Sequence, residues 1–364
     1  MKVLFVSTNN LSDNGISTFI INNSKLLSDK WKVNVNVLAP NYVSESIKNN
    51  LSQSNVRVLE IYNRNSNTLK YFGSLISLLR HEKYDIIHVN GSSTIMSVEL
   101  AAAFLAGIKV RIAHSHNTVT EHNRLNKLLR LPFDMFVNCR IACNEAAGKW
   151  LFKNKSFSII DNGILLDSYR YNSSVRTKLR NKMGVRPDEV LIGHVGEFNN
   201  QKNQEFLLDV LKNLDAHYKL ILVGHGPLLN KVKDKAKELG LSNRIIFPGS
   251  VNNVPDYLSA MDIFTLPSHF EGQPFVAVEA AANGLEMIIS DLVSQEIDLT
   301  NKMSFRKLDT SVWVKSILNT KLKNRGVESA DNISILASKG YDINTNVQKL
   351  YMLYKKQFNR IKKI

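Results

Sequence analysis

Short apolar stretches alternate with longer amphipathic ones along the chain, and this alternation constrains the fold more than any other feature. In the first half, the stretches typical of strands lie at 2–7, 33–38, 56–61, 85–89, 109–114 and 140–143. Segments with helical spacing lie between them, for example at 17–27, 68–80 and 94–105. Strands that alternate with helices predict a doubly wound parallel sheet. Ligands of such sheets bind at the carboxyl ends of the strands.

The alternation stops near residue 163 and restarts near residue 190. A strand at 157–160 and a turn at 161–163 close the first series, and a polar, basic segment at 166–188 follows. The second series has strands at 190–196, 218–223, 245–247, 263–266 and 286–290, with helices at 203–213, 228–239, 254–260 and 275–282. Beyond residue 291 the pattern is helical only. At 364 residues the chain exceeds one ordinary core, so we predict two domains.

The composition is that of a soluble globular protein, with 44% hydrophobic and 22% charged residues. No apolar run reaches the ~18 residues that a bilayer-spanning helix needs. The N-terminal sequence MKVLFVSTNN has no signal-peptide cleavage site, so it predicts a first strand and a cytoplasmic protein. Cys139 and Cys143 have no partner pair and are interpreted as buried, reduced thiols.

The formal net charge of +15 favours an anionic partner. Nucleic acid is not expected, because the chain has no zinc-finger spacing and no RNP motif. An anionic membrane surface fits better. Segment 121–138 mixes apolar residues with Arg124, Lys127 and Arg130 at helical spacing, as interfacial helices do. A membrane-binding helix and an ordinary helix with a solvated basic face are equally open interpretations of this segment.

One stretch, residues 266–291, combines the end of a strand with the start of a helix. Pro267 stops the strand, a short loop follows, and the helix 275–282 begins after Pro274. We expect Pro274 at the first helical position, where its missing N–H costs nothing. Gly284 is the expected stop of the helix before the strand 286–290.

The start of that helix predicts an anion site. The N–H groups of Gln273, Phe275 and Val276 lie at the positive end of the helix dipole and can bind a phosphate. Glu271 precedes the helix, and Glu279 lies roughly 8 Å beyond its start. These three features lie in the order in which a ligand made of a sugar, a diphosphate and a ribose would need them. The first carboxylate would face the sugar, the N–H groups the diphosphate, and the second carboxylate the ribose. A helix with two solvated glutamates is the alternative interpretation, and the strand–loop–helix context favours the functional one.

The pair Glu271 and Glu279, with seven residues between them in a run like P-S-x-x-E-G-x-P, resembles the donor-site motif of glycosyltransferase family 4. The resemblance is closest to the enzymes that build bacterial capsule or exopolysaccharide. It implies the GT-B fold, in which two Rossmann-like domains face a central cleft. It also implies transfer of a hexose or N-acetylhexosamine from a nucleotide-sugar, expected to be a UDP-sugar, to a lipid-linked oligosaccharide, with retention of configuration.

The same resemblance assigns the parts of the chain. The acceptor-binding domain would be 1–163 and the nucleotide-sugar-binding domain 164–343. The final helix, 344–364, would cross back toward the first domain. Asn162-Gly163-Ile164 matches the family's stretch at the crossover. The basic residues of the final helix are interpreted as a solvated end: Lys355, Lys356, Arg360, Lys362 and Lys363.

The resemblance also implies roles for individual residues. Glu271 is expected to hold hydroxyls of the donor sugar and Glu279 the ribose diol. His116, at the end of strand 109–114, is expected to contact the transferred sugar or to position the acceptor. The remaining donor contacts are expected from Gly15, Glu197, Lys202, Ser250, Val251, Gly272, Gln273, Pro274, Phe275 and Val276.

Two positions depart from the family's pattern. Asn14 replaces one of two glycines beside Gly15, and we expect it to keep the turn because Asn tolerates positive φ. Glu197 stands where the family usually has an arginine that grips the diphosphate together with a lysine, here Lys202. A carboxylate beside a diphosphate weakens binding unless a cation compensates. A catalytically impaired homologue, which binds a partner glycosyltransferase or a sugar nucleotide, is therefore the alternative function.

No D-x-D pair occurs in the chain, so we expect neither a metal ion nor another cofactor. Lys202 and the helix dipole would then neutralise the leaving diphosphate. A sugar-nucleotide epimerase or a phosphorylase of the same fold is a third interpretation, and the spacing of Glu271 and Glu279 counts against it.

Overall fold

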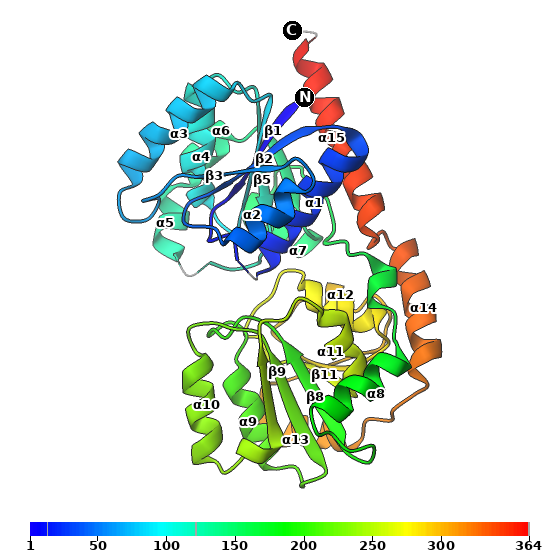
Figure 1. Cartoon of the computed structure of the whole chain (residues 1–364). Coiled ribbons are helices and arrows are strands. Elements are labelled where there is room, and N and C mark those ends of the chain that lie inside the picture. Colours follow the sequence, from blue (N-terminus) through cyan, green and yellow to red (C-terminus); the bar gives the residue numbers. More distant parts are fainter. Residues whose placement is uncertain (13, 121, 363–364) are drawn as a thin grey trace. The chain divides into compact units, whose positions relative to one another are not determined.

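The computed structural model describes residues 1–12, 14–120 and 122–362 (Figure 1). The chain divides into two compact units. One unit is Met1–Asn162 together with Ile343–Ile364, and the other is Gly163–Asp342. The boundaries predicted from the sequence, 163/164 and 343/344, each lie one residue away from these. The C-terminal helix belongs to the first unit.

The first unit is built on a parallel sheet, and its described residues form seven strands in the order β3-β2-β1-β4-β5-β6-β7. The strands are β1 Lys2–Ser7, β2 Asn34–Ala39, β3 Arg57–Glu60, β4 Ile86–Gly91, β5 Val110–Ser115, β6 Cys139–Ala142 and β7 Ser158–Ile159. The helices are α1 Gly15–Trp31, α2 Glu45–Ser52, α3 Thr68–Glu82, α4 Ser97–Leu105, α5 Asn123–Leu128, α6 Arg130–Phe136, α7 Glu145–Phe152 and α15 Ile343–Lys362, with a 3-10 turn η1 at Thr94–Met96.

The second unit repeats this design with six described strands in the order β10-β9-β8-β11-β12-β13. The strands are β8 Val190–Val195, β9 Tyr218–Val223, β10 Ile245–Gly249, β11 Ile263–Leu266, β12 Glu286–Ser290 and β13 Met303–Arg306. The helices are α8 Ser173–Lys182, α9 Gln204–Lys212, α10 Leu229–Glu238, α11 Val254–Ala260, α12 Phe275–Ala282, α13 Thr310–Leu318 and α14 Arg325–Ser338. The 3-10 turns are η2 Leu166–Tyr169, η3 Ser242–Arg244 and η4 Gln295–Ile297.

The central strands are buried on both faces, which explains their nearly continuous apolar sequences. In β1 every residue from Val3 to Ser7 is buried, and all of β4 and β11 are buried as well. Helices cover both faces of a parallel sheet, so its strands cannot alternate polar and apolar side chains. The alternation of apolar strands and helices in the sequence therefore predicted the fold class correctly.

Strand order places a ligand edge in each unit. In the second sheet β8 pairs with β9 on one side and with β11 on the other, so the chain reverses its direction of winding at β8. In the first sheet β1 lies in the same way between β2 and β4. Loops that follow the two strands at such a switch point diverge and leave a crevice at the carboxyl edge of the sheet. Residues 196–203 and 267–274 follow β8 and β11.

Two sequence predictions about secondary structure were wrong. The chain beyond residue 291 is not helical only, because β13 pairs with β12 at the edge of the sheet. This strand has only four residues, Met-Ser-Phe-Arg, so its alternation of apolar and polar side chains is too short to be recognised among the helical segments around it. The segment predicted as one helix, 121–138, is divided: Glu121 lies outside the described residues, and the rest contains α5 and α6, which are separated at Leu129. Pro132 lies in the first turn of α6, and its ring excludes a helical bond to the carbonyl of Leu128.

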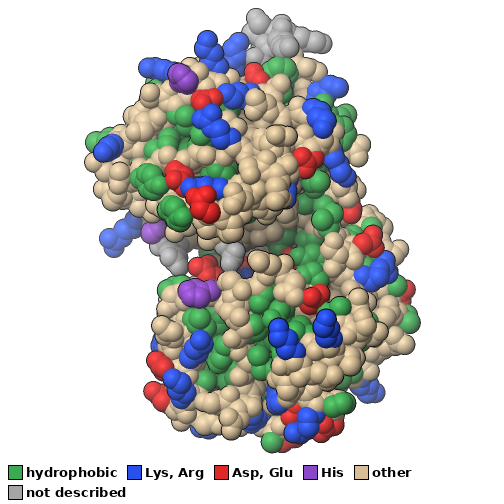
Figure 2. All heavy atoms as spheres, in the orientation of Figure 1, with side chains coloured by type: hydrophobic (Ala, Val, Ile, Leu, Met, Phe, Trp, Pro, Cys, Tyr) green, Lys and Arg blue, Asp and Glu red, His purple; other side chains and the backbone are tan. Residues whose placement is uncertain are grey.

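The charges of the chain are not gathered in one stripe on the face seen in Figure 2, where lysines and arginines are spread over both units with acidic side chains among them. In the part of the chain that the structure describes, no helix combines the length and apolar character needed to cross a bilayer. Both cysteines are free and buried, as predicted. The final helix is present as α15; of its basic residues, Lys363 lies outside the described residues.

Candidate functional site

The N-terminus of α12 lies at the switch point of the second sheet, directly after the loop that follows β11. Pro274 is the N-cap of this helix, with extended backbone angles (φ −69°, ψ 121°), rather than its first residue as predicted. Its carbonyl accepts a hydrogen bond from Ala277 N–H at 3.1 Å. The N–H groups of Phe275 and Val276 belong to the first turn, where helix geometry offers no intrahelical acceptor. They therefore remain the best candidates for binding an anion.

The far end of α12 is held by side chains of α14. Asn332 Nδ2 donates to the carbonyl of Ala281 at 2.8 Å, and Ser329 Oγ donates to that of Ala282 at 2.6 Å. Gly284 ends the helix with φ +75°, as predicted, and a Cβ there would lie 2.7 Å from the backbone nitrogen of Ser329. All residues of α12 are buried, so unsatisfied carbonyls would be costly. These contacts fix the direction of the helix and of its N-terminus.

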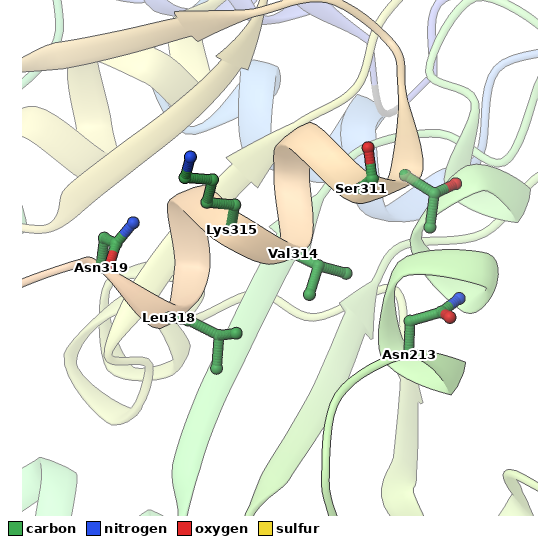
Figure 3. A pocket seen from close by; sticks show the side chains of 7 residues that line it. Asn213, Ser311, Val314, Lys315, Leu318 and Asn319 are labelled. Atoms are coloured by element: carbon green, nitrogen blue, oxygen red, sulfur yellow. The ribbon is translucent and has the colours of Figure 1, made fainter.

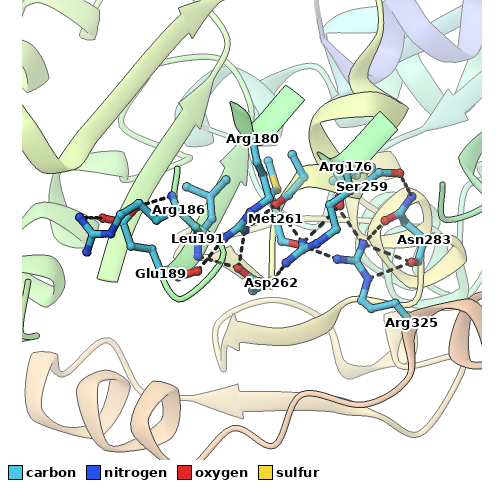
Figure 4. A network of polar contacts seen from close by, with 12 residues as sticks. Arg176, Arg180, Arg186, Glu189, Leu191, Ser259, Met261, Asp262, Asn283 and Arg325 are labelled. Carbon is cyan, nitrogen blue, oxygen red and sulfur yellow. Dashed lines mark hydrogen bonds and ion pairs between the residues drawn. The ribbon is translucent and has the colours of Figure 1, made fainter. Parts of the chain in front are cut away.

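A network of arginines stabilises the same unit at the opposite edge of the sheet (Figure 4). Asp262, just before β11, accepts hydrogen bonds from Arg176 at 2.5 Å and from Arg180 at 2.8 Å. Arg325 donates to the carbonyls of Leu258 and Asn283. These side chains satisfy the carbonyls at the ends of α11 and α12. Because this network lies at the edge of the sheet where β11 begins and not where it ends, it supports the site without belonging to it.

Lys202 and Glu271 form an ion pair across the switch point. Lys202 follows β8 and Glu271 follows β11, and Lys202 Nζ lies 2.6 Å from Glu271 Oε1. Ser268 Oγ donates to the same carboxylate oxygen at 3.0 Å. Glu271 is 7% exposed, so the pair is largely withdrawn from water. The structure thus joins two residues for which the sequence suggested separate roles, and an incoming anion would compete with Glu271 for the lysine.

Glu197, the departure from the family pattern, is half-buried just beyond β8. Its carboxylate accepts a hydrogen bond from Asn199 Nδ2 at 3.2 Å. Asn199 Oδ1 in turn accepts the backbone N–H of Lys202 at 3.0 Å. Gln204 Nε2 donates to the backbone carbonyl of Glu197 at 2.8 Å. The loop after β8 is therefore fixed by its own polar side chains, and Asn199 supplies the hydrogen bond that the Glu197 carboxylate receives there.

The glycine-rich turn after β9 packs directly on this loop. Gly224 has φ +135°, and a Cβ there would lie 2.1 Å from the carbonyl oxygen of Gly196. Gly226 has φ +158°, and a Cβ there would lie 2.5 Å from the backbone nitrogen of Phe198. Phe198 N–H donates to the carbonyl of His225 at 2.9 Å. The backbone of this turn is in direct contact with the backbone of the loop after β8. This contact explains why glycine is needed at both positions, without any role in binding a ligand.

The other predicted donor residues of the second unit occupy the same edge. Ser250 and Val251 follow β10, Ser250 exposed and Val251 half-buried. Gly272 and Gln273 lie in the buried loop before α12. Gln273 Nε2 donates to the hydroxyl of Tyr341 at 2.5 Å. The carboxyl edge of the second sheet thus collects the predicted contacts that follow β8, β10 and β11.

Glu279 lies one turn into α12 and is 8% exposed. Burial raises the pKa of this carboxyl to about 7, while the hydroxyl of Tyr169 and the positive charge of Lys202 act in the opposite direction. Tyr169 Oη donates to Glu279 Oε1 at 2.9 Å. Tyr169 could not be selected from the sequence, because it lies in the polar segment 166–188, where no motif is present.

Gly15 and His116 belong to the first unit. Gly15 is the exposed first residue of α1. The expectation that Asn14 keeps the turn by adopting positive φ was wrong. Its backbone is extended (φ −136°, ψ 164°), and its side chain caps α1 by accepting a hydrogen bond from Ser17 N–H at 3.0 Å. The amide thus replaces a glycine turn with an N-cap.

His116 follows β5 and is 8% exposed. Its backbone N–H donates to the carbonyl of Gly91 at 3.1 Å, and its Nε2 lies 3.0 Å from Asn90 Oδ1. Burial lowers the pKa of His116 to about 3, so the imidazole is neutral at physiological pH. A neutral ring can position a sugar hydroxyl but carries no charge to offer a phosphate.

His116 stacks on a buried group of rings that sequence reasoning did not find. The rings of His114 and His116 are stacked with centroids 4.1 Å apart. His114 Nδ1 lies 3.1 Å from His88 Nε2, and His88 Nδ1 lies 2.5 Å from the hydroxyl of Tyr354 in α15. Phe19 contacts the group from α1, with its ring 4.6 Å from that of His114. The position of His116 therefore depends on the C-terminal helix.

One groove of the second unit lies away from this edge. A groove of about 570 Å³ runs between α13 and the end of α9, and Lys315, Val314 and Leu318 line it opposite Asn213 (Figure 3). No predicted site residue lines it. Among the described residues, no three His, Cys, Asp or Glu side chains are grouped so that they could hold a metal ion.

Comparison with solved structures defines the class. The chain superposes on the crystal structure of Anabaena Alr3699/HepE in complex with UDP and glucose with a TM-score of 0.81, covering 98% of this chain and 100% of that chain. Sequence identity is 20%, so the match shows the fold alone. Two Rossmann-like units of this kind make up the GT-B fold.

Sequence comparison identifies the family. The model of "Glycosyltransferase Family 4" matches residues 13–168, and that of "Glycosyl transferases group 1" matches residues 175–301. The putative glycosyltransferase EpsF of Bacillus subtilis is 32% identical over 271 residues, which are 70% of each chain. The chain therefore belongs to glycosyltransferase family 4.

Two further relatives indicate the biological setting. The capsular polysaccharide biosynthesis glycosyltransferase CapH of Staphylococcus aureus is 27% identical over 77% of this chain and 79% of its own. An Escherichia coli enzyme described as UDP-Gal:alpha-D-GlcNAc-diphosphoundecaprenol alpha-1,3-galactosyltransferase is 29% identical over 72% of this chain and 75% of its own. The chain is a glycosyltransferase of bacterial polysaccharide biosynthesis, as the sequence motif predicted.

Proposed function

We propose that this protein transfers a hexose or N-acetylhexosamine from a UDP-sugar to a lipid-linked oligosaccharide, with retention of configuration and without a metal ion. One observation carries the proposal: the fixed N-terminus of α12 lies at the switch point between the Lys202–Glu271 pair and Glu279. The names of two relatives support the substrates, since one structure was solved with UDP and another relative uses an acceptor linked to diphosphoundecaprenol.

In this proposal the diphosphate binds at the helix start. The N–H groups of Phe275 and Val276 and the loop residues Gly272 and Gln273 receive its oxygens, and the positive end of the helix dipole favours their charge. Pro274 fixes the turn. Charge that develops on the leaving diphosphate is stabilised by these preorganised donors and by Lys202.

Binding of the donor exchanges one partner of Lys202 for another. Before binding, the lysine is neutralised by Glu271 at 2.6 Å. A diphosphate carries more charge than a carboxylate and draws the lysine toward itself. Glu271 is then free to accept hydrogen bonds from hydroxyls of the donor sugar, while Ser268 still donates to it. The nucleotide base lies toward Ser250 and Val251, at the end of β10.

His116 acts in this proposal as a neutral hydrogen-bonding group for the transferred sugar or the acceptor. Its low pKa means that it neither carries a proton to the leaving group nor loses one near pH 7. Gly15, at the start of α1, lets the backbone approach the donor and acceptor closely. We expect retention of configuration because the pair Glu271 and Glu279 resembles the donor-site motif of retaining enzymes.

The acceptor is a lipid, so we propose that the protein works at the cytoplasmic face of the membrane. Four apolar side chains of α5 and α6 support a docking role because they are strongly exposed: Leu125 at 47%, Leu128 at 74%, Leu131 at 77% and Met135 at 62%. Arg124 and Lys127 are exposed among them. Exposed apolar side chains flanked by cations are typical of interfacial helices.

Co-sedimentation with vesicles tests the membrane contact. The variant Arg124→Glu/Lys127→Glu should lose binding to phosphatidylglycerol vesicles while neither protein binds phosphatidylcholine. Arg130 is left unchanged because its guanidinium donates to the carbonyl of Leu151 at 2.6 Å and supports the fold. A variant with two reversed charges at Lys237 and Lys212, both exposed, is the control. Equal binding by the Arg124/Lys127 variant and the wild type would remove the membrane from the proposal.

A transfer assay tests the reaction. Purified protein is incubated with UDP-sugars and an undecaprenyl-diphosphate-linked sugar in detergent, and UDP release and product formation are measured. We expect one UDP-sugar to give acceptor-dependent turnover that survives EDTA and is lost in Glu271→Gln. Nuclear magnetic resonance of the new linkage then reports its configuration, which should equal that of the donor. No turnover with any UDP-sugar would contradict the proposed donor, and inhibition by EDTA would contradict metal independence.

A further inference from the structure

Tyr169 contacts helix α12 at two positions. Its hydroxyl donates to Glu279 Oε1 at 2.9 Å, and its backbone carbonyl accepts a hydrogen bond from Asn283 Nδ2 at 2.8 Å. Residues four apart lie on one face of a helix. Tyr169 ends the 3-10 turn η2, which packs against α12 near the start of the second unit. One residue of η2 therefore fixes both the end of the helix and the carboxylate on its face.

Glu279 is an ionisable group in a site that water hardly reaches. Its side chain is 8% exposed, and burial raises its pKa to about 7. Lys202 is the cation that acts on this carboxyl. The other ionisable side chains on the elements packed against α12 are paired elsewhere or exposed: Asp167 with Arg170, Glu286 with Lys323, Glu328 with Lys302, Arg325 with Asn283, and Asp331 in solvent.

From this geometry we infer that Tyr169 is the positioning residue of the ribose site: its hydroxyl, which donates to Glu279 Oε1, holds this carboxylate turned toward the two ribose hydroxyls of the nucleotide. The inference rests on the proposed function, since it takes Glu279 to be the ribose contact. A carboxylate can accept hydrogen bonds from both hydroxyls, whereas a protonated carboxyl has lost half of that capacity. Tyr169 occupies one lone pair of Oε1 and leaves Oε2 and the rest of Oε1 for the ligand.

The effect of removing the hydroxyl depends on pH in a defined direction. Glu279 must be ionised to accept from the ribose, and it is ionised above its pKa. In Tyr169→Phe the burial remains but the opposing hydrogen bond is lost, so the pKa of Glu279 rises further. At pH 7 the carboxyl is then mostly protonated and binds ribose poorly. At pH 9 it ionises again, and binding returns.

Calorimetric titration with UDP and with 2′,3′-dideoxy-UDP, at pH 7 and pH 9, tests the inference. We expect Tyr169→Phe to weaken UDP binding about tenfold at pH 7, since a hydrogen bond to a charged group is lost, and less than about threefold at pH 9. Binding of dideoxy-UDP should be the same for both proteins. Tyr171→Phe is the matched control, because its ring packs on Arg325 and it lies two residues from Tyr169. It should bind UDP as the wild type does.

Two results would overturn the inference. Tyr169→Phe could bind UDP as tightly as the wild type at pH 7, or it could lose UDP and dideoxy-UDP equally at both pH values, which indicates general damage to α12. Failure of the wild type to bind UDP at any pH would instead refute the proposed function. A titration without ligand supports the reading: in protein labelled with ¹³C-glutamate, the signal that vanishes in Glu279→Gln should titrate at higher pH in Tyr169→Phe, and an unchanged midpoint would also overturn the inference.

Discussion

The second sheet carries an ion pair at its switch point, whereas the first sheet buries neutral imidazoles within β4, within β5 and just after β5. After β8 and β11 lie Lys202 and Glu271, paired at 2.6 Å. The first sheet instead buries His88, His114 and His116, whose pKa values are all lowered by burial. Strand order is the same in both sheets around β8 and β1. The topology therefore decides where a ligand site lies, and the side chains at the strand ends decide which chemistry it has.

This contrast has a consequence for stability, and acidification should produce the largest difference between the units. Buried histidines that stay neutral when folded take up protons when unfolded, so each one lowers stability by about 1.4 kcal/mol per pH unit below pH 6.5. In the second unit, His194 acts in this way because burial lowers its pKa to about 3. Glu279 opposes it there, because a pKa of about 7 lets the folded state take up a proton first.

We therefore expect the first unit to lose about 4 kcal/mol between pH 7.5 and pH 5.5, and the second unit less than about 1 kcal/mol. Hydrogen exchange in increasing urea, corrected for intrinsic rates, measures the two units separately. The variant His114→Gln should reduce the loss in the first unit by about a quarter to a third. Equal losses in the two units would show that the imidazoles of the first unit are not held neutral.

The backbone contact after β9 should give the next largest effect. In Gly224→Ala the new Cβ would lie 2.1 Å from the carbonyl of Gly196, at φ +135°. We expect the free energy of unfolding of the second unit to fall by about 3 kcal/mol. Gly240→Ala is the control, since Gly240 also has positive φ, +70°, but no atom lies within 4 Å of its Cβ position. It should cost about 1 kcal/mol. Equal losses in chemical denaturation would exclude the close contact as the cause.

The charge at position 197 should have the smallest effect. Replacing Glu197 by Arg adds a cation beside Lys202, and we expect the affinity for UDP to rise about three- to tenfold, less so at high salt. Glu238→Arg makes the same charge change at the other end of the sheet and should leave the affinity unchanged. The wild type could instead bind no UDP while Glu197→Arg binds it. This result would mean that the natural protein has lost its ability to bind the diphosphate, and it would favour the alternative function, a catalytically impaired homologue.

How far the sequence could predict the structure depended on how local the determinants were. Helix α12 was predicted at 275–282 and β12 at 286–290, because apolar residues, Pro274 and Gly284 mark their limits along the chain. The edge strand β13 was missed, since pairing with β12 stabilises it rather than its own four residues. The break between α5 and α6 could have been found from Pro132.

The polar partners could not be predicted, because tertiary contacts create them. Tyr354 lies 266 residues from His88, and Tyr169 lies 110 residues from Glu279. No motif in either segment marks these tyrosines. The sequence suggested roles for Lys202 and Glu271 separately, but their pairing follows only from the neighbouring positions of β8 and β11 in the sheet. The sequence motifs therefore identified the site residues, whereas the fold determines which partners these residues have.

The central claim is that the charged switch point of the second unit binds the diphosphate of a UDP-sugar through Lys202. Calorimetric titration of UDP into the wild type, Lys202→Ala and Lys212→Ala tests it most directly, because Lys212 is an exposed lysine at the other end of α9. We predict that Lys202→Ala weakens UDP binding about 30-fold, as expected for a partly buried cation that meets a phosphate, and that Lys212→Ala binds normally. Equal affinity of Lys202→Ala and the wild type would contradict the account.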